Sequence, residues 1–244
     1  MEDTYNTKAI ILRRTPYRES DLRLTVYTPE HGKKILIARG ALKQKAKLTG
    51  HLEPLVLSDV MIVRGKNYDY IGSAQGKKFY LNIKSDLEKT KYASLILKTV
   101  DKYTREDDDF SPGLFYKFVD FLDTLEEDDR IVSNDLLYIS FLFKILFFLG
   151  FCPNFYKCLD CKKEIKYENL IFDISNGGIV CPKCLDKGNI ILEKSKIIKI
   201  SPDCLKVVRF LIQSDFYKIK KLKIEDDIFK EILILINSFY NYHL

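Results

Sequence analysis

The sequence predicts an α+β protein, in which a small five-stranded barrel over residues 1–80 is followed by a helical domain over residues 81–244. Three observations predict this fold. Short stretches with an apolar residue at every second position fill the first third of the chain. Apolar residues at helical spacing replace them after Ser85. Two Cys-x-x-Cys pairs interrupt the helices at about residues 155–190. The chain has 244 residues, 46% of them hydrophobic, so it can bury a core without covalent cross-links.

The strands of the barrel follow from alternation and turn signals. Asp21–Thr28 alternates apolar and polar side chains, as a half-buried strand does. The turn-forming residues Pro29–Gly32 then lead into a second strand, Lys33–Arg39, which predicts a hairpin. The remaining strands are expected at Ile10–Arg14, Leu55–Arg64 and Tyr68–Ser73. Five short strands within about 80 residues suit a closed barrel, because closure removes exposed strand edges.

The helices follow from capping residues and apolar stripes. A capping box at Ser85–Glu88 predicts the first helix. Later helices are expected to begin at Ser111, Ser133, Ser201 and about Glu225. The most apolar stretch, Leu136–Phe151, has 16 residues against the ~20 that span a bilayer, so it predicts a buried core helix and no membrane span. The acidic runs Glu106–Asp109 and Glu126–Asp129 are expected to be solvated loops between helices.

The cysteines carry the strongest chemical signal. The acidic, polar N-terminus is unlike a signal peptide, so we expect a cytosolic protein with reduced thiols. Two Cys-x-x-Cys pairs separated by 19 residues fit one structural zinc ion, held by Cys158, Cys161, Cys181 and Cys184. Four thiolates leave no coordination position for water, so the metal is expected to be structural. Disulfides, a redox pair or unrelated buried cysteines are the alternatives. Cys152 and Cys204 are expected to be small apolar residues.

No catalytic pattern stands out. His51-Leu-Glu53 followed by a cysteine pair is similar to zinc deaminases, but Pro182 lies inside the pair instead of before it, so we reject that interpretation. Phosphate-binding glycine motifs and a nucleophile elbow are absent. We therefore expect a protein that is not an enzyme.

Positive charge is concentrated in the first third of the chain. Residues 1–85 contain 16 Lys and Arg against 8 Asp and Glu, whereas residues 86–150 contain 8 against 14. Five of the nine arginines fall between Arg13 and Arg39, which the general excess of lysine over arginine does not explain. Such a basic patch is typical of a surface that binds a polyanion, and nucleic acid is the favoured ligand.

The candidate nucleic-acid-binding residues are Arg13, Arg14, Arg18, Arg23, Lys33, Lys34, Arg39, Lys43, Lys45 and Lys47. The last three alternate, so an extended chain would place them on one side at a repeat of about 6.6 Å, where they could follow a phosphate backbone. Tyr17 and Tyr27 are candidates for stacking on bases. A merely solvated lysine-rich surface is the alternative.

The chain also resembles the bacterial recombination mediator family RecO. The resemblance rests on the order and spacing of several stretches: Ala9–Leu22, Tyr27–Lys33, Ala38–Leu42, Leu52–Leu55 and Leu149–Asn154, followed by the two cysteine pairs. It implies that the barrel is an OB-fold and that the zinc ribbon is inserted in an otherwise all-α domain. It further implies binding to single- and double-stranded DNA and annealing of complementary strands.

The resemblance implies partners as well. These are RecR, the acidic C-terminal tail of single-strand-binding protein and, indirectly, RecA, which is loaded onto coated single strands in recombinational repair. It implies a cytoplasmic, nucleoid-associated protein. The basic residue that the family carries just before the central apolar helix corresponds here to Ser140, which argues against a tail contact at this position; Lys144 and Arg209 are the candidates to substitute for it. Three other functions remain open: a zinc-ribbon factor for RNA or transcription, a metal-dependent hydrolase using the acidic runs, and a scaffold that binds only proteins.

Overall fold

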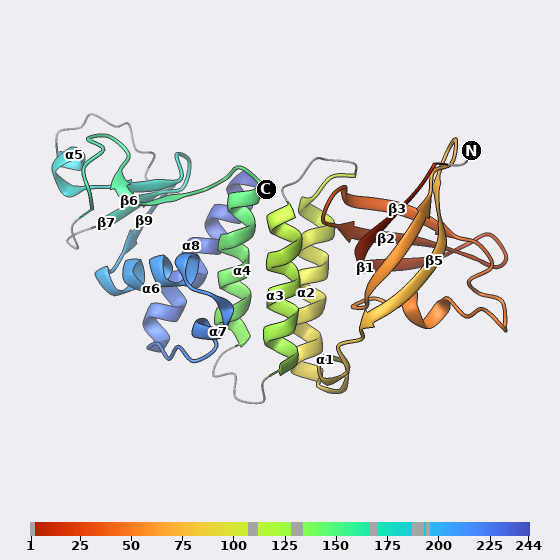
Figure 1. The fold of residues 1–244 in the computed structure, drawn as a ribbon. Coiled ribbons are helices and arrows are strands. Elements are labelled where there is room, and N and C mark those ends of the chain that lie inside the picture. The colour runs from red at the N-terminus through yellow and green to blue at the C-terminus, as the bar shows by residue number, and fades with distance from the viewer. Residues whose placement is uncertain (1–2, 107–111, 128–133, 166–169, 187–192, 194–195) are drawn as a thin grey trace. The chain divides into compact units, whose positions relative to one another are not determined.

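The structure is a computed structural model that describes residues 3–106, 112–127, 134–165, 170–186, 193 and 196–244 (Figure 1). The chain forms two compact units, Met1–Asp129 and Arg130–Leu244. The mixed α+β class is confirmed, with a strand-rich N-terminal sheet and helices after it. The first three helices belong to the same compact unit as the sheet.

The N-terminal sheet contains five strands: β1 (Thr4–Tyr17), β2 (Asp21–Thr28), β3 (Gly32–Ala38), β4 (Leu57–Val63) and β5 (Asp69–Lys78). All five predicted strands are present, and β1 and β5 are longer than the sequence pattern indicates. β1 pairs with both β2 and β4, and the short parallel pair of β3 with β5 completes the ring, so the strand order is that of a closed barrel.

Alternate side chains of these strands fill the interior of the barrel. The interior cluster contains Ala9, Ile11, Leu22, Leu24, Val26, Leu36, Ala38, Ala41, Leu52, Val60, Ile62 and Ile71. Leu52 belongs to a short 3-10 helix, η1 (Thr49–Leu52), and is completely buried. The segment between β3 and β4 therefore contributes to the core at the same time as it connects two strands.

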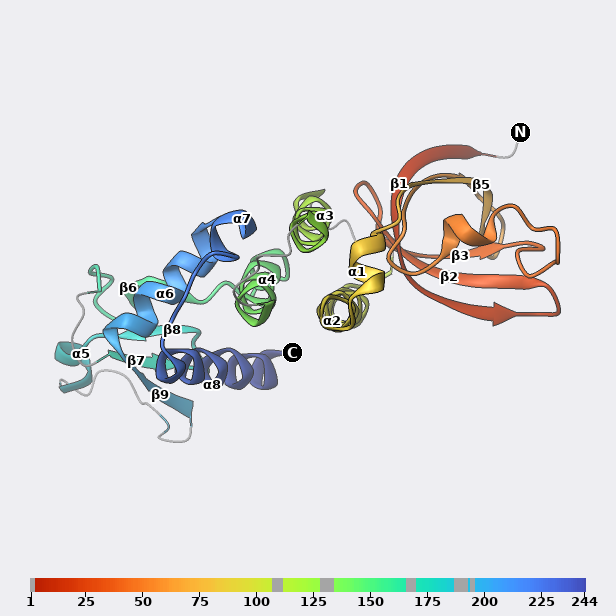
Figure 2. The same cartoon turned by 90° about the horizontal axis from the view of Figure 1, so that it is seen from below.

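Helices α1 (Leu81–Ser85), α2 (Leu87–Tyr103) and α3 (Pro112–Glu127) complete the first unit, with α2 beside β1 (Figure 2). The predicted cap is displaced by one residue: Asp86, not Ser85, accepts a hydrogen bond from the Lys89 backbone N–H, while Ser85 ends the unpredicted helix α1. α2 packs on β1 and α3 packs on β2. This packing buries Thr25 and Tyr27, whose face of β2 alternation alone predicts to be exposed.

The second acidic run is not a simple solvated loop. Glu126 lies in the last turn of α3, and its two carboxylate oxygens accept the backbone N–H groups of Asn82 (3.1 Å) and Ile83 (2.9 Å). These donors belong to the first turn of α1, where backbone N–H groups lack partners within the helix. The prediction that this run lies in a loop between helices is therefore wrong for Glu126 and for Glu127, which both belong to α3. Asp107–Asp109 of the first run and Asp128–Asp129 of the second lie outside the described residues.

The second unit contains α4 (Asn134–Phe148), α5 (Pro182–Asp186), α6 (Pro202–Gln213), α7 (Phe216–Ile219) and α8 (Asp226–His243). α4 is buried along most of its length, as predicted for the apolar stretch. Ser201 caps α6 by accepting the Cys204 N–H. The predicted caps Ser111 and Ser133 lie outside the described residues. Among the helices that the structure describes, none has both the length and the apolar character needed to cross a membrane.

The second unit also contains a four-stranded sheet, so its description as all-α apart from a ribbon is incomplete. The strand order is β6 (Asn154–Cys158), β8 (Gly178–Val180), β7 (Leu170–Asp173) and β9 (Ile197–Ile200). Pairing of β7 with β9 joins the cysteine-bearing segment to the chain just before α6. The cysteine pairs therefore lie at one end of a sheet that is continuous with the helical unit.

Candidate metal centre and nucleic-acid interface

The four paired cysteines come together in space. The sulfur atoms of Cys158, Cys161, Cys181 and Cys184 all lie within 4.8 Å of one another. The Sγ atoms of Cys161 and Cys181 are 3.9 Å apart. Four sulfurs at the Zn–S distance of ~2.3 Å from one central ion would be separated by about 3.8 Å at tetrahedral angles. The cluster thus has the size that a tetrahedral metal ion requires.

Two tight turns produce this arrangement. In the first, Lys162 donates its N–H to the Cys158 carbonyl (3.1 Å) and adopts a positive φ of 58°, which reverses the chain. In the second, the Cys184 N–H donates to the Cys181 carbonyl (3.0 Å) at the start of α5. Gly178 precedes the second turn, and a Cβ atom at this position would lie 2.6 Å from Leu159 Cδ2, so a larger residue here would displace the Leu159 side chain.

The thiols of the cluster differ in acidity. Burial opposes ionisation of Cys158, but hydrogen bonds from the backbone N–H groups of Cys181, Cys161 and Asp160 outweigh it and lower its pKa to about 7. Burial and the neighbouring thiols raise the pKa of Cys181 and of Cys184. Four thiolates at these distances need a cation, which deprotonates its thiol ligands. The donor set therefore fits a thiolate-bound metal ion.

The other two cysteines differ from each other. Cys204 is completely buried in α6, as predicted for a small apolar residue, and burial raises its pKa to about 12. Cys152 is exposed, so its prediction is wrong. It lies in the irregular segment between α4 and β6, where the chain has left the core.

The structure places four of the ten candidate basic residues in ion pairs within the first unit. Lys33 Nζ lies 2.6 Å and Arg13 Nε 3.2 Å from the carboxylate of Asp101 on α2. Further pairs join Arg14 to Glu53 (2.9 Å) and Lys34 to Asp69 (3.2 Å). The side chains of Lys33 and Lys34 are only 15% and 13% exposed, so these two lysines have a structural role in addition to any contact with a ligand.

The other six candidates are exposed: Arg18, Arg23, Arg39, Lys43, Lys45 and Lys47. Arg18 forms the turn between β1 and β2 with a φ of 54°, and its guanidinium lies 5.2 Å from the centroid of the Tyr17 ring. The Arg39 guanidinium lies 3.9 Å from the centroid of the Tyr70 ring. Aromatic rings therefore hold two of these cations at the surface.

The segment with alternating lysines is not extended. Turns occupy most of residues 39–50, and backbone hydrogen bonds join the Lys43 N–H to the Gly40 carbonyl and the Ala46 N–H to the Lys43 carbonyl. The regular repeat expected for an extended chain is therefore wrong. The three lysines remain exposed on a folded loop, so they offer a cluster of positive charge rather than a straight row.

One of the two predicted stacking residues is inaccessible. Tyr27 is 1% exposed and belongs to the core, whereas Tyr17 is half-buried at the end of β1. Tyr68 was not predicted from the sequence as a stacking residue; it is 44% exposed in the turn before β5 and makes an edge-to-face contact with Tyr17 at 6.3 Å between ring centroids. Its position beside Gly65 in a turn between strands was a signal that it lies at a loop tip.

The histidines have structural partners. His51 Nδ1 accepts the Gly76 backbone N–H (3.2 Å), which explains its position in the barrel without deaminase chemistry. His243 lies 2.7 Å from the Ile174 carbonyl, and His31 packs edge-on against Tyr5.

The two cations considered for the tail of single-strand-binding protein also have internal partners. The Lys144 ammonium is buried and donates to the carbonyls of Leu211 (2.7 Å) and Ile212 (2.8 Å) at the end of α6. Ser140 donates to the same Leu211 carbonyl. The Arg209 guanidinium donates to the Phe155 carbonyl from both Nε and Nη2. Both cations thus stabilise the second unit.

The fold and its two candidate sites define a class of α+β proteins in which a cation-rich barrel is joined to a helical unit with a four-cysteine metal site. Family models identify which member of this class the chain is. The model for the N-terminal part of recombination protein O matches residues 1–80, and the model for its C-terminal part matches residues 84–244. The chain therefore belongs to the RecO family.

Individual relatives agree over nearly the whole length. A DNA repair protein RecO from Dehalococcoides mccartyi is 30% identical over 234 residues, which cover 96% of this chain and 88% of the relative. The DNA repair protein RecO of Desulforamulus reducens is 28% identical over 240 residues, which cover 98% and 90%. The one from Clostridium perfringens is 27% identical over 236 residues. Membership of this family assigns the chain to DNA repair and recombination.

Proposed function

We propose that this protein is a recombination mediator that binds single- and double-stranded DNA and anneals complementary strands. The observation that carries the proposal is the group of exposed cations on a barrel that belongs to the RecO family. Two single strands repel each other through their phosphates, and a cationic surface that binds both lowers this repulsion. The protein would act as a scaffold with no bond-making chemistry of its own.

The barrel is proposed to be an OB-fold. Five strands, a mixed pairing pattern and a short helix in the connection from β3 to β4 support this assignment. OB-folds bind nucleic acid on a strand face and adjoining loops. Such a surface on this chain would include β2, β3 and the loop with Lys43, Lys45 and Lys47.

The four-cysteine cluster is proposed to hold one Zn²⁺ ion with a structural role. Sulfur ligands in a tetrahedral set favour zinc, and four protein ligands leave no open position for substrate or water. The ion would join the turn after β6 to the first turn of α5. Zinc would therefore stabilise the sheet of the second unit, with no direct part in DNA binding.

The partners are proposed from the family. We infer that the protein acts with RecR to load RecA onto single strands coated with single-strand-binding protein, and that it contacts the acidic tail of that protein. It would do so in the cytoplasm at the nucleoid, where these partners and DNA are found. The internal partners of Lys144 and Arg209 indicate that the tail contact uses other residues of the chain.

The test is annealing of complementary strands coated with single-strand-binding protein, with and without the acidic tail. The variant combines Lys43→Ala, Lys45→Ala and Lys47→Ala. The matched control replaces three exposed lysines on helices, Lys98, Lys206 and Lys230, by alanine. The barrel variant should lose annealing, and the dependence of log K for single strands on log salt should become shallower by about 2, because each phosphate contact contributes about 0.7. The control should keep both.

Each outcome separates parts of the proposal. Annealing that requires the tail supports the full mediator role. Annealing of bare strands only keeps the DNA-binding barrel but removes the tail contact. No annealing by the folded, zinc-loaded protein, together with preferential binding of RNA, would favour the RNA or transcription factor. An equal loss in the barrel variant and the control would refute the assigned surface.

A further inference from the structure

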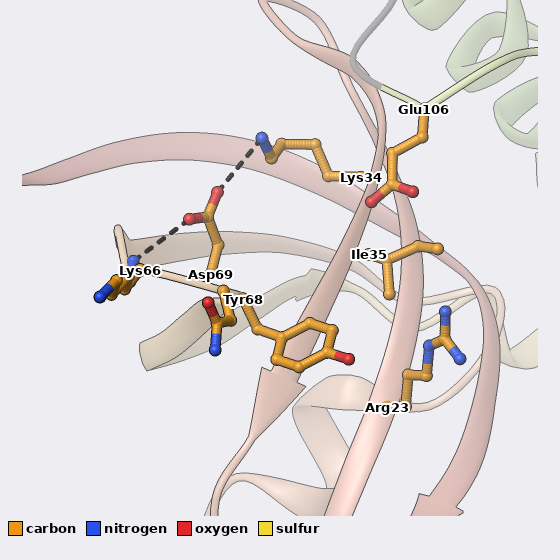
Figure 3. A pocket seen from close by; sticks show the side chains of 9 residues that line it. Arg23, Lys34, Ile35, Lys66, Tyr68, Asp69 and Glu106 are labelled. Carbon is orange, nitrogen blue, oxygen red and sulfur yellow. Dashed lines mark hydrogen bonds and ion pairs between the residues drawn. The ribbon is translucent and has the colours of Figure 1, made fainter.

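A polar pocket lies on the barrel between β2, β3 and the turn that connects β4 to β5 (Figure 3). Its volume is about 300 Å³, which is at the small end of the range for ligand sites. Arg23 and Lys34 come from the two strands, whereas Lys66, Tyr68 and Asp69 come from the turn and the start of β5. The pocket thus joins exposed cations, one aromatic ring and carboxylates.

Tyr68 is the aromatic surface of this pocket. The side chain extends from the turn toward the strand that carries Arg23 (Figure 3). It is 44% exposed, although a tyrosine of this size gains free energy when its ring is covered. Its edge-to-face contact with Tyr17 fixes the ring from one side. An exposed ring that is already held in place loses little conformational freedom when a flat ligand stacks on it.

The charges in the pocket decide what kind of ligand fits. Arg23 is exposed at the rim, and among the described residues no acidic side chain pairs with it. Inside the pocket, Asp69 and Glu106 present carboxylates. Lys34 forms an ion pair with Asp69 at 3.2 Å, not with Glu106. Because Lys34 offsets the charge of Asp69, a phosphate in the interior would face the carboxylate of Glu106, whereas a phosphate at the rim would meet Arg23 and Lys66.

We propose that this pocket holds one unpaired nucleobase of a single DNA strand, stacked on Tyr68, with the neighbouring phosphates on Arg23 and Lys66. A nucleobase has a flat face for the ring, and every DNA base carries an exocyclic amino group or a ring N–H that a carboxylate accepts. The inference rests on the proposed binding of DNA and adds to it a site that distinguishes single strands from duplexes.

The selectivity follows from base accessibility. In a duplex both faces of each base are covered by its neighbours, so Tyr68 could stack only after a base is extruded, which costs a few kcal/mol. In a single strand the bases are available, and stacking on an aromatic side chain contributes about 1–3 kcal/mol per base. Tyr68 should therefore contribute to single-strand affinity and hardly at all to duplex affinity.

The experiment compares binding of a fluorescent 20-nucleotide single strand and of the corresponding duplex to the full chain at fixed salt. Tyr68→Ala should weaken single-strand binding about 5- to 150-fold, which is the stacking contribution converted to affinity. Duplex binding should change less than twofold. Tyr68→Phe keeps the ring and should bind as the unchanged protein does. Tyr116→Ala, which removes a 56%-exposed tyrosine of α3 outside the pocket, is the matched control and should have no effect.

A second measurement does not depend on affinity. A 2-aminopurine base in the single strand should lose fluorescence on binding to the unchanged protein and to Tyr68→Phe, and keep more of it with Tyr68→Ala. Equal weakening of single-strand and duplex binding by Tyr68→Ala, or no change in either, would overturn the inference while DNA binding itself stands. If the unchanged protein binds neither DNA, the proposed function fails and the inference fails with it.

Discussion

Lys144 is a cation inside the helical unit, and its removal gives the most specific stability prediction. The side chain is 9% exposed, and its ammonium donates to the carbonyls of Leu211 and Ile212. These carbonyls belong to the last turn of α6, where helical carbonyls lack partners and the helix end is negative. The Phe216 ring lies 5.5 Å away. We expect Lys144→Met to destabilise the second unit while preserving its fold.

The magnitude follows from what each group loses. In the variant, the Leu211 carbonyl keeps its hydrogen bond from Ser140 (2.8 Å). The Ile212 carbonyl loses its hydrogen bond from Lys144 and has no such second donor from Ser140. Hydrogen bonds that involve a charged group contribute about 1.5–3 kcal/mol each, and an unsatisfied buried carbonyl costs about 1–3 kcal/mol. Methionine recovers part of this loss, because it fills a similar volume without a desolvated ammonium. The net loss should be about 2–4 kcal/mol.

Urea unfolding followed by circular dichroism measures this loss. The midpoint should fall at an unchanged slope, since the folded state keeps its surface. Lys230→Met is the matched control, because the Lys230 side chain is 69% exposed on α8 and pairs with the exposed Asp227. That variant should stay within about 0.5 kcal/mol of the unchanged protein. A Lys144→Met protein as stable as the control would refute the assigned role of the buried ammonium.

Three further predictions concern the candidate sites. Asp101→Asn should remove the ion pairs of Arg13 and Lys33, although Lys33 also donates to the Asp101 backbone carbonyl, which asparagine keeps. The protein should then bind DNA more tightly with a steeper salt dependence, yet unfold about 1–2 kcal/mol more easily; weaker DNA binding would contradict this. Cys181→Ser should lower the zinc content, measured by mass spectrometry, below one ion per chain and should lower the midpoint of thermal unfolding. The matched control Cys152→Ser should change neither quantity. Burial opposes ionisation of Asp173, but hydrogen bonds from Asn176 and Ser175 outweigh it and lower the pKa of this carboxyl. The stabilisation by the ionised carboxylate is therefore present above the unfolded pKa of ~3.9 and is lost as the pH falls through the folded pKa. The stability difference between the unchanged protein and Asp173→Ala, measured by urea unfolding, should shrink below about pH 4, and a constant difference would refute this prediction.

Features with local causes could be predicted from the sequence. The cysteine cluster follows from spacing, because the short turn within each Cys-x-x-Cys pair brings its two thiols together whatever surrounds them. The five strands follow from alternation and turn residues, and Ser201 was correctly identified as a helix cap. In each case the residues that decide the structure are neighbours in the chain.

Features that depend on distant contacts were missed. Tyr27 lies on the face of β2 that alternation predicts to be polar, but helix packing on the barrel buries it. β9 is a four-residue strand, Ile-Ile-Lys-Ile, which is too short to distinguish from part of a helix by pattern. Glu126 was assigned to a loop because its partners, the N–H groups of α1, are 43 or more positions earlier in the chain.

The basic face shows why charge counts overstate a binding surface. Residues 1–85 carry twice as many basic as acidic residues, yet Arg13 and Lys33 share Asp101, which lies on a helix outside that segment. Asp101 thus neutralises two of the basic side chains and also links α2 to strands β1 and β3 through these ion pairs. The cations that remain available lie in the β1–β2 turn, on β2, at the end of β3 and in the loop after it. On the proposed surface, a DNA strand that followed these cations would pass the exposed ring of Tyr68, which would connect the electrostatic surface to the proposed site for a base. We therefore expect that affinity through phosphates and preference for single strands can be altered separately on this protein.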